Sequence, residues 1–387
     1  MTENINLQGA GHDSISLLFG HPDPSTLLTP EFQFAMQCVF SDPSLATSLQ
    51  YGPEQGNPEL IQFLANKINR EQELSIRSEN LMVVAGSTHA VDMLARLYAG
   101  PNSVVLVEAP TYADSLSIFR DHQIELYAIP MDEDGLIPEA LEAQLLRLHE
   151  RGKDPVMLYT IPNFHNPTGS TLTVERRREI VALARRFGFL IVEDDVYRDL
   201  TFGAVPPPSF YALADGVGVM SIGSFSKTLA PGLRLGWLLA SEDIIQRCVV
   251  CGTTQMGGGA NPFVAHIVSE YCKSGHWETH VAHLCTLYQE RRDTMLAALS
   301  RSMPADVTWT QPLGGFFTWL SLPRTVSAQH IKQLALQEKV TLATGGGFFV
   351  NPGDGDHNLR LAYSYATSTD IDVGVSRLAQ IIQLART

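Results

Sequence analysis

The first 60 residues of this 387-residue chain contain neither lysine nor arginine, and the whole chain carries 27 basic residues against 41 acidic ones. The formal net charge is −14. Proteins that bind nucleic acid need a basic patch to neutralise phosphates, so we expect no nucleic-acid partner. Charged residues make up only 18% of the chain. This low share favours burial of part of the surface between subunits.

Long apolar runs and cysteines are also scarce. No run approaches the ~20 apolar residues of a membrane-spanning helix, and the N-terminus lacks the basic and apolar regions of a signal peptide. We therefore expect no membrane association and a cytoplasmic location. The five cysteines include one C-x-x-C pair, Cys248 and Cys251. It lies in an apolar, helix-like stretch without a second pair, so we interpret it as core packing and expect no metal.

Between residues 81 and 240, short β-rich runs alternate with amphipathic helical patterns, as in a mostly parallel α/β sheet. Seven strands are predicted, at residues 81–84, 104–108, 124–129, 156–161, 189–193, 217–222 and 235–240. Many of these runs are apolar on both faces, as expected when helices cover both sides of the sheet. We predict a large domain over residues 31–285, a smaller α+β domain over 286–387, and an N-terminal arm over 1–30 that packs on the smaller domain.

Lys227 stands in an unusual setting among the six lysines. It follows Ser224 and Ser226 and precedes Arg234, in a segment that is otherwise apolar or small. An amine among apolar neighbours loses hydration, so its pKa falls and it can act as a nucleophile. Hydroxyls and a guanidinium beside it would suit a phosphate dianion. The alternative is a surface lysine in a loop, with Arg234 in an ordinary ion pair.

Further polar motifs follow predicted strands directly, where ligands bind in open α/β sheets. Gly86 precedes Ser87 and Thr88 at the start of a helical pattern, which can hold an anion but is more often a simple cap. Asn166 precedes Pro167 after another strand, and it could point its amide into the crevice or only form a turn. His165 beside it has no evident carboxylate partner, so we interpret it as structural.

Asp194 follows a strand and Tyr197 comes three residues later. A carboxylate there can keep a pyridine nitrogen protonated, so that the ring accepts electrons. Asp195 points elsewhere in an extended segment and is the lesser candidate. The acidic cluster could instead be a solvated turn or a metal site, although no further ligand is close in sequence. Tyr112 also follows a strand, and its ring could stack on a cofactor or lie in the core.

Together these residues resemble those of the fold-type I pyridoxal 5'-phosphate-dependent aminotransferases of class I/II, and most of all the branch with the 2-aminoadipate/kynurenine aminotransferases. The resemblance spans about Gly20 to Tyr365. It rests on the S-x-S-K-x6-R segment, on N-P-T-G at 166–169 and on D-x-x-Y at 194–197. The segments at 51–60, 312–319 and 359–364 also match. The resemblance implies the fold just described, with a seven-stranded, mostly parallel large sheet.

The resemblance also implies residue roles. Lys227 would form the internal aldimine, Asp194 would pair with the pyridine nitrogen, and Tyr197 and Asn166 would hydrogen-bond the phenolic oxygen. Tyr112 would stack on the ring, Arg360 would bind the substrate α-carboxylate, and Gly20 and Asn166 would contact the substrate. The phosphate would be held by Ser87, Thr88, Ser224, Ser226 and Arg234, and by Tyr51 of a neighbouring subunit. The active sites would therefore be shared within a homodimer.

The expected activity is transfer of an amino group from an L-amino acid to a 2-oxo acid, with 2-oxoglutarate as the acceptor that the resemblance implies. Relatives that accept dicarboxylic side chains can use an N-terminal arginine, which this chain lacks. Only His12 and His21 could carry positive charge there. We therefore expect neutral aliphatic, aromatic or thioether donors. A β-elimination lyase on the same scaffold stays open, and a non-enzymatic regulator is disfavoured because only about 20 residues precede the match.

Overall fold

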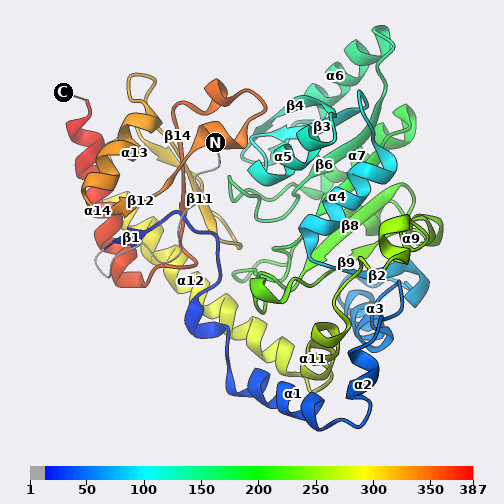
Figure 1. Ribbon diagram of the computed structural model, residues 1–387. Helices are drawn as coiled ribbons and strands as arrows, with labels where there is room; N and C mark the ends of the chain where they lie inside the picture. The colour runs from blue at the N-terminus through cyan, green and yellow to red at the C-terminus, as the bar shows by residue number, and fades with distance from the viewer. Residues whose placement is uncertain (1–13, 387) are drawn as a thin grey trace.

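The computed structural model describes residues 14–386 as two bodies, each built on its own sheet (Figure 1). An eight-stranded sheet in the first body has the order β2-β9-β8-β7-β6-β3-β4-β5. Its strands are β2 (Leu81–Val84), β3 (Val104–Ala109), β4 (Glu125–Asp132), β5 (Gly135–Leu136), β6 (Pro155–Thr160), β7 (Leu190–Asp194), β8 (Val219–Ser224) and β9 (Gly236–Leu239). The five central strands β8, β7, β6, β3 and β4 pair in parallel, while β9, β2 and β5 pair antiparallel.

All seven expected strands form, and the mostly parallel character of the sheet is confirmed. The expected count of seven is one too low. A two-residue strand, β5, turns back on β4 and pairs Leu136 with Met131. Gly135 has φ +93°, and a Cβ there would lie 2.8 Å from Leu172 Cδ1, so only glycine fits this turn without strain. A segment this short carries no alternating pattern by which the sequence could reveal it.

Alternate residues of each strand enter two separate cores, because successive side chains point to opposite faces. On β3, Val104 and Leu106 pack with one group of helices, and Val105 and Val107 pack with the other. The first group comprises α1 (Pro30–Ser41), α3 (Pro58–Gln72), α6 (Pro138–Glu150), α7 (Val174–Phe187), α8 (Phe210–Leu213) and α11 (Pro262–Lys273). The second comprises α4 (Ser87–Tyr98), α5 (Ala113–Asp121) and α9 (Glu242–Val249). The short helices α2 (Leu45–Ser48) and α10 (Gly252–Gln255) complete this body.

Cys248 and Cys251 are buried in the second core with α9, and their thiols are unpaired. The packing that was expected of the C-x-x-C pair is therefore present. Burial raises the pKa of Cys248 to about 12. Within residues 14–386, no helix is long and apolar enough to cross a membrane.

The second body holds a four-stranded sheet in the order β10-β11-β14-β13. Its elements are α12 (His276–Ser302), β10 (Thr308–Trp309), β11 (Phe317–Ser321), α13 (Ala328–Gln337), β12 (Val340–Thr341), β13 (Ala343–Thr344), β14 (Asn358–Ala362) and α14 (Ser368–Leu384). The N-terminal strand β1 (Ile15–Ser16) pairs in parallel with β12. Five short 3-10 helices lie at Pro24–Thr26, Ser78–Asn80, Pro231–Leu233, Gly345–Phe348 and Pro352–Gly355.

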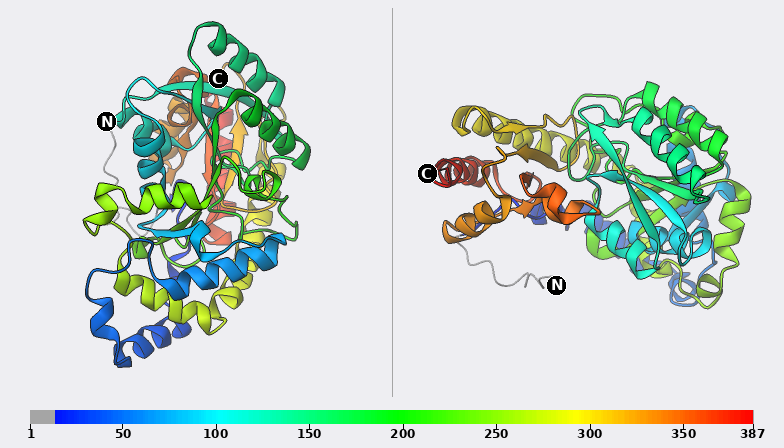
Figure 2. Two further views of the ribbon diagram at one scale, coloured as in Figure 1. Left: turned by 90° about the vertical axis from the view of Figure 1, so that its right-hand side faces the viewer. Right: turned by 90° about the horizontal axis from the view of Figure 1, so that it is seen from above.

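The long helix α12 links the two bodies, packing on α11 at one end and on α14 at the other (Figures 1 and 2). It begins at His276, so the proposed boundary between residues 285 and 286 falls within a continuous helix. The carboxyl ends of β3, β6, β7 and β8 face β11 and β14 of the smaller sheet, as residues from both sides line one cavity. This geometry places the polar strand-end motifs where both bodies can supply side chains.

Candidate active site

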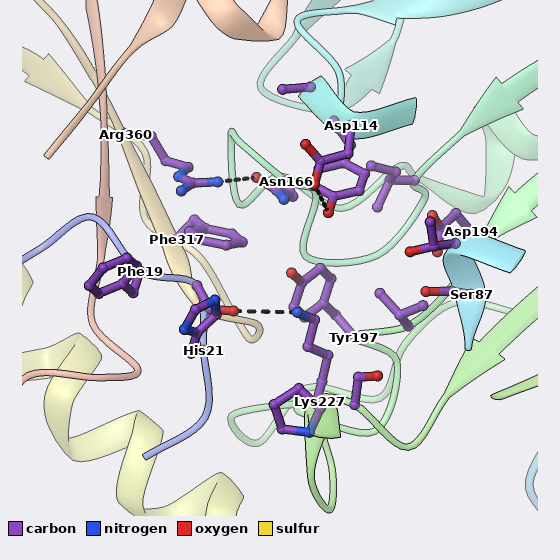
Figure 3. A pocket seen from close by; sticks show the side chains of 18 of the residues that line it. Phe19, His21, Ser87, Asp114, Asn166, Asp194, Tyr197, Lys227, Phe317 and Arg360 are labelled. Carbon is purple, nitrogen blue, oxygen red and sulfur yellow. Dashed lines mark hydrogen bonds between the residues drawn. The ribbon is translucent and has the colours of Figure 1, made fainter. Parts of the chain in front are cut away.

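A cavity of about 380 Å³ lies between the two sheets. Its lining joins residues from the N-terminal segment, from the strand ends of the large sheet and from β11 and β14 of the small one (Figure 3). Eleven of the thirteen predicted site residues line it: Gly20, Ser87, Thr88, Tyr112, Asn166, Asp194, Tyr197, Ser226, Lys227, Arg234 and Arg360. Residues that are up to 340 positions apart in the chain are thus brought into one cavity.

Lys227 lies in the turn after β8 and points into the centre of the cavity (Figure 3). Its Nζ donates one hydrogen bond, to the carbonyl oxygen of Gly20 at 3.3 Å. No carboxylate within ion-pair distance of this amine occurs among residues 14–386. Burial, with the nearby positive charge of Arg360, lowers the pKa of Lys227 to about 8. Near neutral pH, a much larger fraction of this amine is therefore neutral and nucleophilic than of an ordinary lysine, whose pKa is about 10.4.

Asp194 ends β7 and is 95% buried. Its Oδ2 accepts a hydrogen bond from the Tyr159 hydroxyl at 2.6 Å, whereas its Oδ1 is buried without a partner in the described chain. Burial raises the pKa of Asp194 to about 6, against the opposing effect of the Tyr159 hydrogen bond. An unpaired buried carboxylate oxygen is costly, so this atom fits a ligand that brings a charged donor.

An anion cradle is built at the start of α4. Helix α4 begins at Ser87, and its first backbone N–H groups lie at the positive end of the helix dipole. Gly86 has φ +87°, and a Cβ there would lie 2.5 Å from the Arg234 guanidinium. Only glycine therefore lets Arg234 lie against this turn. Arg234 Nη1 also donates to the Ser226 hydroxyl at 3.5 Å, which gathers the hydroxyls and the guanidinium at one end of the cavity.

Ser224 does not line the cavity, contrary to the expectation that it contacts the phosphate. It is 98% buried, and its Oγ accepts a hydrogen bond from the backbone N–H of Ser226 at 3.1 Å. Ser224 therefore fixes the turn that presents Ser226 and Lys227. The S-x-S-K spacing alone could not separate these two roles, because both serines are equally close to the lysine in sequence.

Arg360 enters the cavity from the centre of β14, the strand between β11 and β13. Its Nη1 donates to Asn166 Oδ1 and its Nη2 to the Leu18 carbonyl, both at 2.9 Å. The guanidinium carbon lies 4.2 Å from the ring centroid of Phe317 and 4.9 Å from that of Phe348. These contacts hold the guanidinium plane in one orientation, as planar recognition of a carboxylate requires. Burial lowers the pKa of Arg360 to about 10.

Two tyrosines line the cavity beside Lys227. The ring centroid of Tyr197 lies 5.8 Å from Lys227 Nζ, and burial raises the pKa of its phenol. The Tyr112 hydroxyl donates to Asp114 Oδ2 at 2.5 Å, and burial with this carboxylate raises the Tyr112 pKa (Figure 3). Both phenols therefore stay protonated, which makes them hydrogen-bond donors at neutral pH.

Several residues in or directly behind the cavity were not predicted. Tyr159 does not line the cavity, but its hydroxyl contacts Asp194; it lies within a buried strand, and this contact depends on the pairing of β6 with β7. Phe317 follows the Gly314-Gly315 pair, which was noticed as a segment but not assigned a role. Phe348 follows three consecutive glycines, a signal for close backbone approach that could have been used. Leu18, Phe19 and Asp114 also line the cavity.

Three residues that were discussed from the sequence lie elsewhere or outside the described chain. Tyr51 does not line the cavity, and 87% of its surface is exposed. Asp195 points away from the cavity and accepts hydrogen bonds from Asn163 and Arg198. His12 lies outside the described residues.

Known proteins are similar to this chain in fold and in sequence. The family description "Aminotransferase class I and II" matches residues 43–378. An aromatic-amino-acid aminotransferase of Thermococcus litoralis is 33% identical over 96% of this chain and 88% of its own. A 2-aminoadipate transaminase of Thermus thermophilus is 36% identical over 87% of this chain and 82% of its own. The crystal structure of Pyrococcus horikoshii kynurenine aminotransferase superimposes with a TM-score of 0.91 at 32% identity, covering 96% and 91% of the two chains.

Proposed function

The chain belongs to the class I and II aminotransferases and is a pyridoxal phosphate-dependent transaminase, and we propose that it uses neutral L-amino acids as donors and 2-oxoglutarate as acceptor. The observation that carries the proposal is the set of charges around the cavity. Within the described chain, Arg360 is the only guanidinium near Lys227 apart from Arg234 in the anion cradle. One arginine can hold one α-carboxylate, and no further arginine among residues 14–386 lines the cavity to hold a distal carboxylate.

The residues present fit the cofactor. The unpaired Asp194 Oδ1 suits a protonated pyridine nitrogen, and the cradle of Ser87, Thr88, Ser226 and Arg234 suits a phosphate dianion. When bound, the cofactor supplies an aldehyde that joins reversibly to amines and a ring that withdraws electrons from the attached carbon. Tyr112 is proposed to stack on that ring, with Tyr197 and the Asn166 amide donating to its phenolic oxygen.

Lys227 has the central role in the proposal. Its pKa of about 8 leaves enough neutral amine to bind the cofactor aldehyde near neutral pH. Once the donor amino group has replaced Nζ on the cofactor, the freed Nζ would take the proton from the donor α-carbon and deliver it to the cofactor. The Gly20 carbonyl, 3.3 Å away, accepts from the protonated amine. Gly20 itself must stay a glycine, because a Cβ would lie 2.3 Å from the Phe317 ring.

Arg360 is proposed to bind the donor α-carboxylate. Its buried Nε lacks a partner, and its two terminal nitrogens contact an amide oxygen and a carbonyl rather than a carboxylate. A charged partner is therefore missing from a largely buried cation. Fixing the carboxylate here orients the α C–H bond toward Lys227, which is the positional part of the catalysis.

The rest of the cavity supports donors with neutral side chains. The rings of Phe19, Phe317 and Phe348 line it and offer apolar contact. The one histidine, His21, stacks on Phe19 at 5.2 Å, and burial with the charges of Lys227 and Arg360 lowers its pKa. His21 is therefore neutral at pH 7 and supplies no charge for a distal carboxylate.

A homodimer with shared active sites is proposed from the surface around Tyr51. This exposed tyrosine and Arg234 line a second cavity of about 480 Å³. Large apolar side chains are exposed on the same part of the chain and on the neighbouring α10 end: Phe34, Phe40, Leu49 and Met256. Apolar exposure of this kind marks an interface. In the proposed dimer, Tyr51 of one copy would reach the anion cradle of the other copy. We also propose a cytoplasmic location, in line with five unpaired cysteines.

The test is a donor panel. The purified holoenzyme is mixed with single amino acids without any oxo acid, and conversion of the cofactor's visible band to the pyridoxamine phosphate band is followed. We expect rapid conversion with alanine, leucine, methionine or phenylalanine and slow conversion with 2-aminoadipate. Fast conversion by 2-aminoadipate, with the four neutral donors inert, would contradict the donor proposal. Release of pyruvate and ammonia from a β-substituted donor, without band conversion, would instead identify a lyase.

A further inference from the structure

A buried acid–imidazole pair lies behind the active-site cavity and does not line it. Glu108 and His165 are each 99% buried, and Glu108 Oε2 lies 3.1 Å from His165 Nε2. Glu108 stands at the end of β3, four residues before Tyr112, and His165 directly precedes Asn166. The pair therefore joins the two loops that carry Tyr112 and Asn166. No carboxylate partner of this histidine was evident from the sequence, and the structure shows that Glu108 is one.

Glu108 accepts three hydrogen bonds, all from the end of β6 and the loop after it. Its Oε1 accepts from the Thr160 hydroxyl at 2.6 Å. Its Oε2 accepts from the Ile161 backbone N–H at 2.9 Å and from His165 Nε2. No lysine or arginine forms an ion pair with Glu108 in the described part of the chain. Three donors stabilise a buried carboxylate without a cation, so the pair fixes the end of β3 to the loop after β6.

The hydrogen bonds also determine which nitrogen of His165 carries the proton. The backbone N–H of Thr168 points at Nδ1 at 3.3 Å, and a backbone N–H can only donate. Nδ1 is therefore the acceptor, and the Thr168 hydroxyl lies 2.9 Å from the same atom. The proton is then on Nε2, which donates to Glu108. A neutral ring in this one tautomer connects Glu108 with the turn at Thr168, on the far side of Asn166.

The loop between these contacts is held on its other side by the small sheet. Gly169 has φ +73°, and a Cβ there would lie 2.6 Å from the Phe317 carbonyl oxygen. The His165 N–H donates to the Ser170 carbonyl at 2.9 Å, which closes the turn. Asn166 lies within this turn, and its Oδ1 accepts the hydrogen bond from Arg360 Nη1 at 2.9 Å. A small displacement of the turn would therefore break the contact with Arg360.

We infer that His165, held by Glu108, is a positioning residue that sets the Asn166 amide for two tasks at once, binding Arg360 and donating to the cofactor's phenolic oxygen. The second task rests on the function proposed above. His165 touches neither the substrate nor the cofactor, so its effect passes through Asn166. The Glu108 bond is the decisive one, because within residues 14–386 no other side-chain hydrogen bond links the turn to a different strand of the large sheet.

Three variants of one residue separate the two contacts. His165→Leu removes both hydrogen bonds and leaves Glu108 with one donor fewer. His165→Gln places an amide nitrogen near the Nε2 position, which keeps the donor to Glu108. His165→Asn places an amide oxygen near the Nδ1 position, which keeps the acceptor for Thr168. If the Glu108 bond positions Asn166, glutamine rescues the enzyme and asparagine does not.

Two readouts on the holoenzyme follow the two tasks. We expect His165→Leu and His165→Asn to raise KM for the amino donor and to lower kcat/KM by about 10- to 100-fold, the range seen when a supporting contact is lost. In a pH titration of the cofactor's visible band without substrate, the midpoint should move to higher pH in these variants, because a donor to the phenolic oxygen stabilises its anion. His165→Gln should stay within about threefold of wild type in KM.

The matched control is His122→Leu, which removes another histidine–carboxylate contact, at 2.8 Å to Asp92, away from the cavity. It should leave KM and the titration midpoint unchanged, even if the melting temperature falls. A wild-type KM and midpoint in His165→Leu would overturn the inference, as would equal rescue by asparagine and glutamine. If the leucine variant does not fold, the comparison of glutamine with asparagine decides. If the wild-type band converted only with 2-aminoadipate, the donor proposal would fail, and this inference would still be tested by measuring KM with that donor.

Discussion

Two lysines of this chain are removed from bulk water and have opposite electrostatic environments. Lys67 on α3 is 97% buried, and its Nζ lies 2.7 Å from Glu71 and 2.8 Å from Asp199. Although burial alone would lower its pKa, the two carboxylates raise it. Within residues 14–386, Lys227 in the cavity has only the Gly20 carbonyl as a hydrogen-bond partner, and burial with Arg360 lowers its pKa to about 8. Burial thus makes an amine reactive only where no carboxylate compensates for the lost hydration.

The same contrast separates the two sites as a whole. Around Lys67 each charge has its partner, and Nζ also lies 4.9 Å from the Trp277 ring centroid. Around Lys227, Asp194 Oδ1 and Arg360 Nε are buried without partners in residues 14–386. Unpaired buried groups destabilise the protein, so they are expected where a ligand completes them. The lysine with incomplete pairing, not the more deeply buried one, marks the active site.

Replacing Lys227 with alanine should have the largest effect. Turnover should fall by at least about four orders of magnitude, because the nucleophile and the proton carrier are lost together. The melting temperature of the cofactor-free protein should stay equal or rise, since a cation that is poorly solvated in the folded state is removed. Steady-state rates and thermal unfolding check both points. Wild-type turnover in this variant would end the assignment of Lys227.

Replacing Lys67 with methionine should do the reverse. Two carboxylates would lose their cation, so the free energy of unfolding should fall by about 3 kcal/mol, with turnover at 25 °C nearly unchanged. Urea unfolding measures the loss. The exposed Lys273, which pairs with Glu59, is the control, and its methionine variant should lose less than about 1 kcal/mol. An equal loss at both positions would show that burial of Lys67 adds nothing to its ion pairs.

The smallest expected effect is a difference between Lys227 and Lys67 in how their labelling by an amine-reactive reagent depends on pH. In cofactor-free protein, an amine-reactive reagent should modify Lys227 at a rate that rises about tenfold per pH unit up to about 8 and then levels off, because only the neutral amine reacts. Lys67 should stay unmodified through that range, since its pKa is raised. Peptide mass analysis after timed labelling gives both rates. A Lys227 rate that still rises tenfold per unit above pH 9 would contradict the lowered pKa.

Local patterns predicted much of this molecule. The helix α7 begins after Thr173, whose side chain accepts from the N–H of Arg176, and ends at Gly188 in a left-handed conformation. A threonine before and a glycine after a helical pattern are ordinary start and stop signals of a helix. The seven strands were likewise predicted from local patterns. The strand-end motifs, together with the family resemblance, predicted eleven residues that line one cavity. Such predictions succeed because caps, alternation and strand ends depend on neighbours in sequence.

Contacts over long sequence distances were missed. Nothing in the sequence near Lys67 sets it apart from the other lysines, because its partner Asp199 is 132 residues away. Ser224 and Ser226 have the same chemistry and were given the same role, but only the turn after β8 decides that one faces the cavity. The contact between Glu108 and His165 was not predicted, because it is the pairing of β3 with β6 that brings these two residues together.

The sequence by itself determined the kinds of groups available and the strand ends on which they stand. Lys227 and Asp194 were identifiable from their positions in the sequence, whereas Arg360 was assigned only through the family resemblance. The tertiary structure alone decided which charges are compensated. Desolvation and Coulomb interactions depend on distances of a few ångströms between atoms that folding brings together from distant parts of the chain. The tertiary structure therefore decided that Lys67 is a stabilising cation and that Lys227 is a reactive amine.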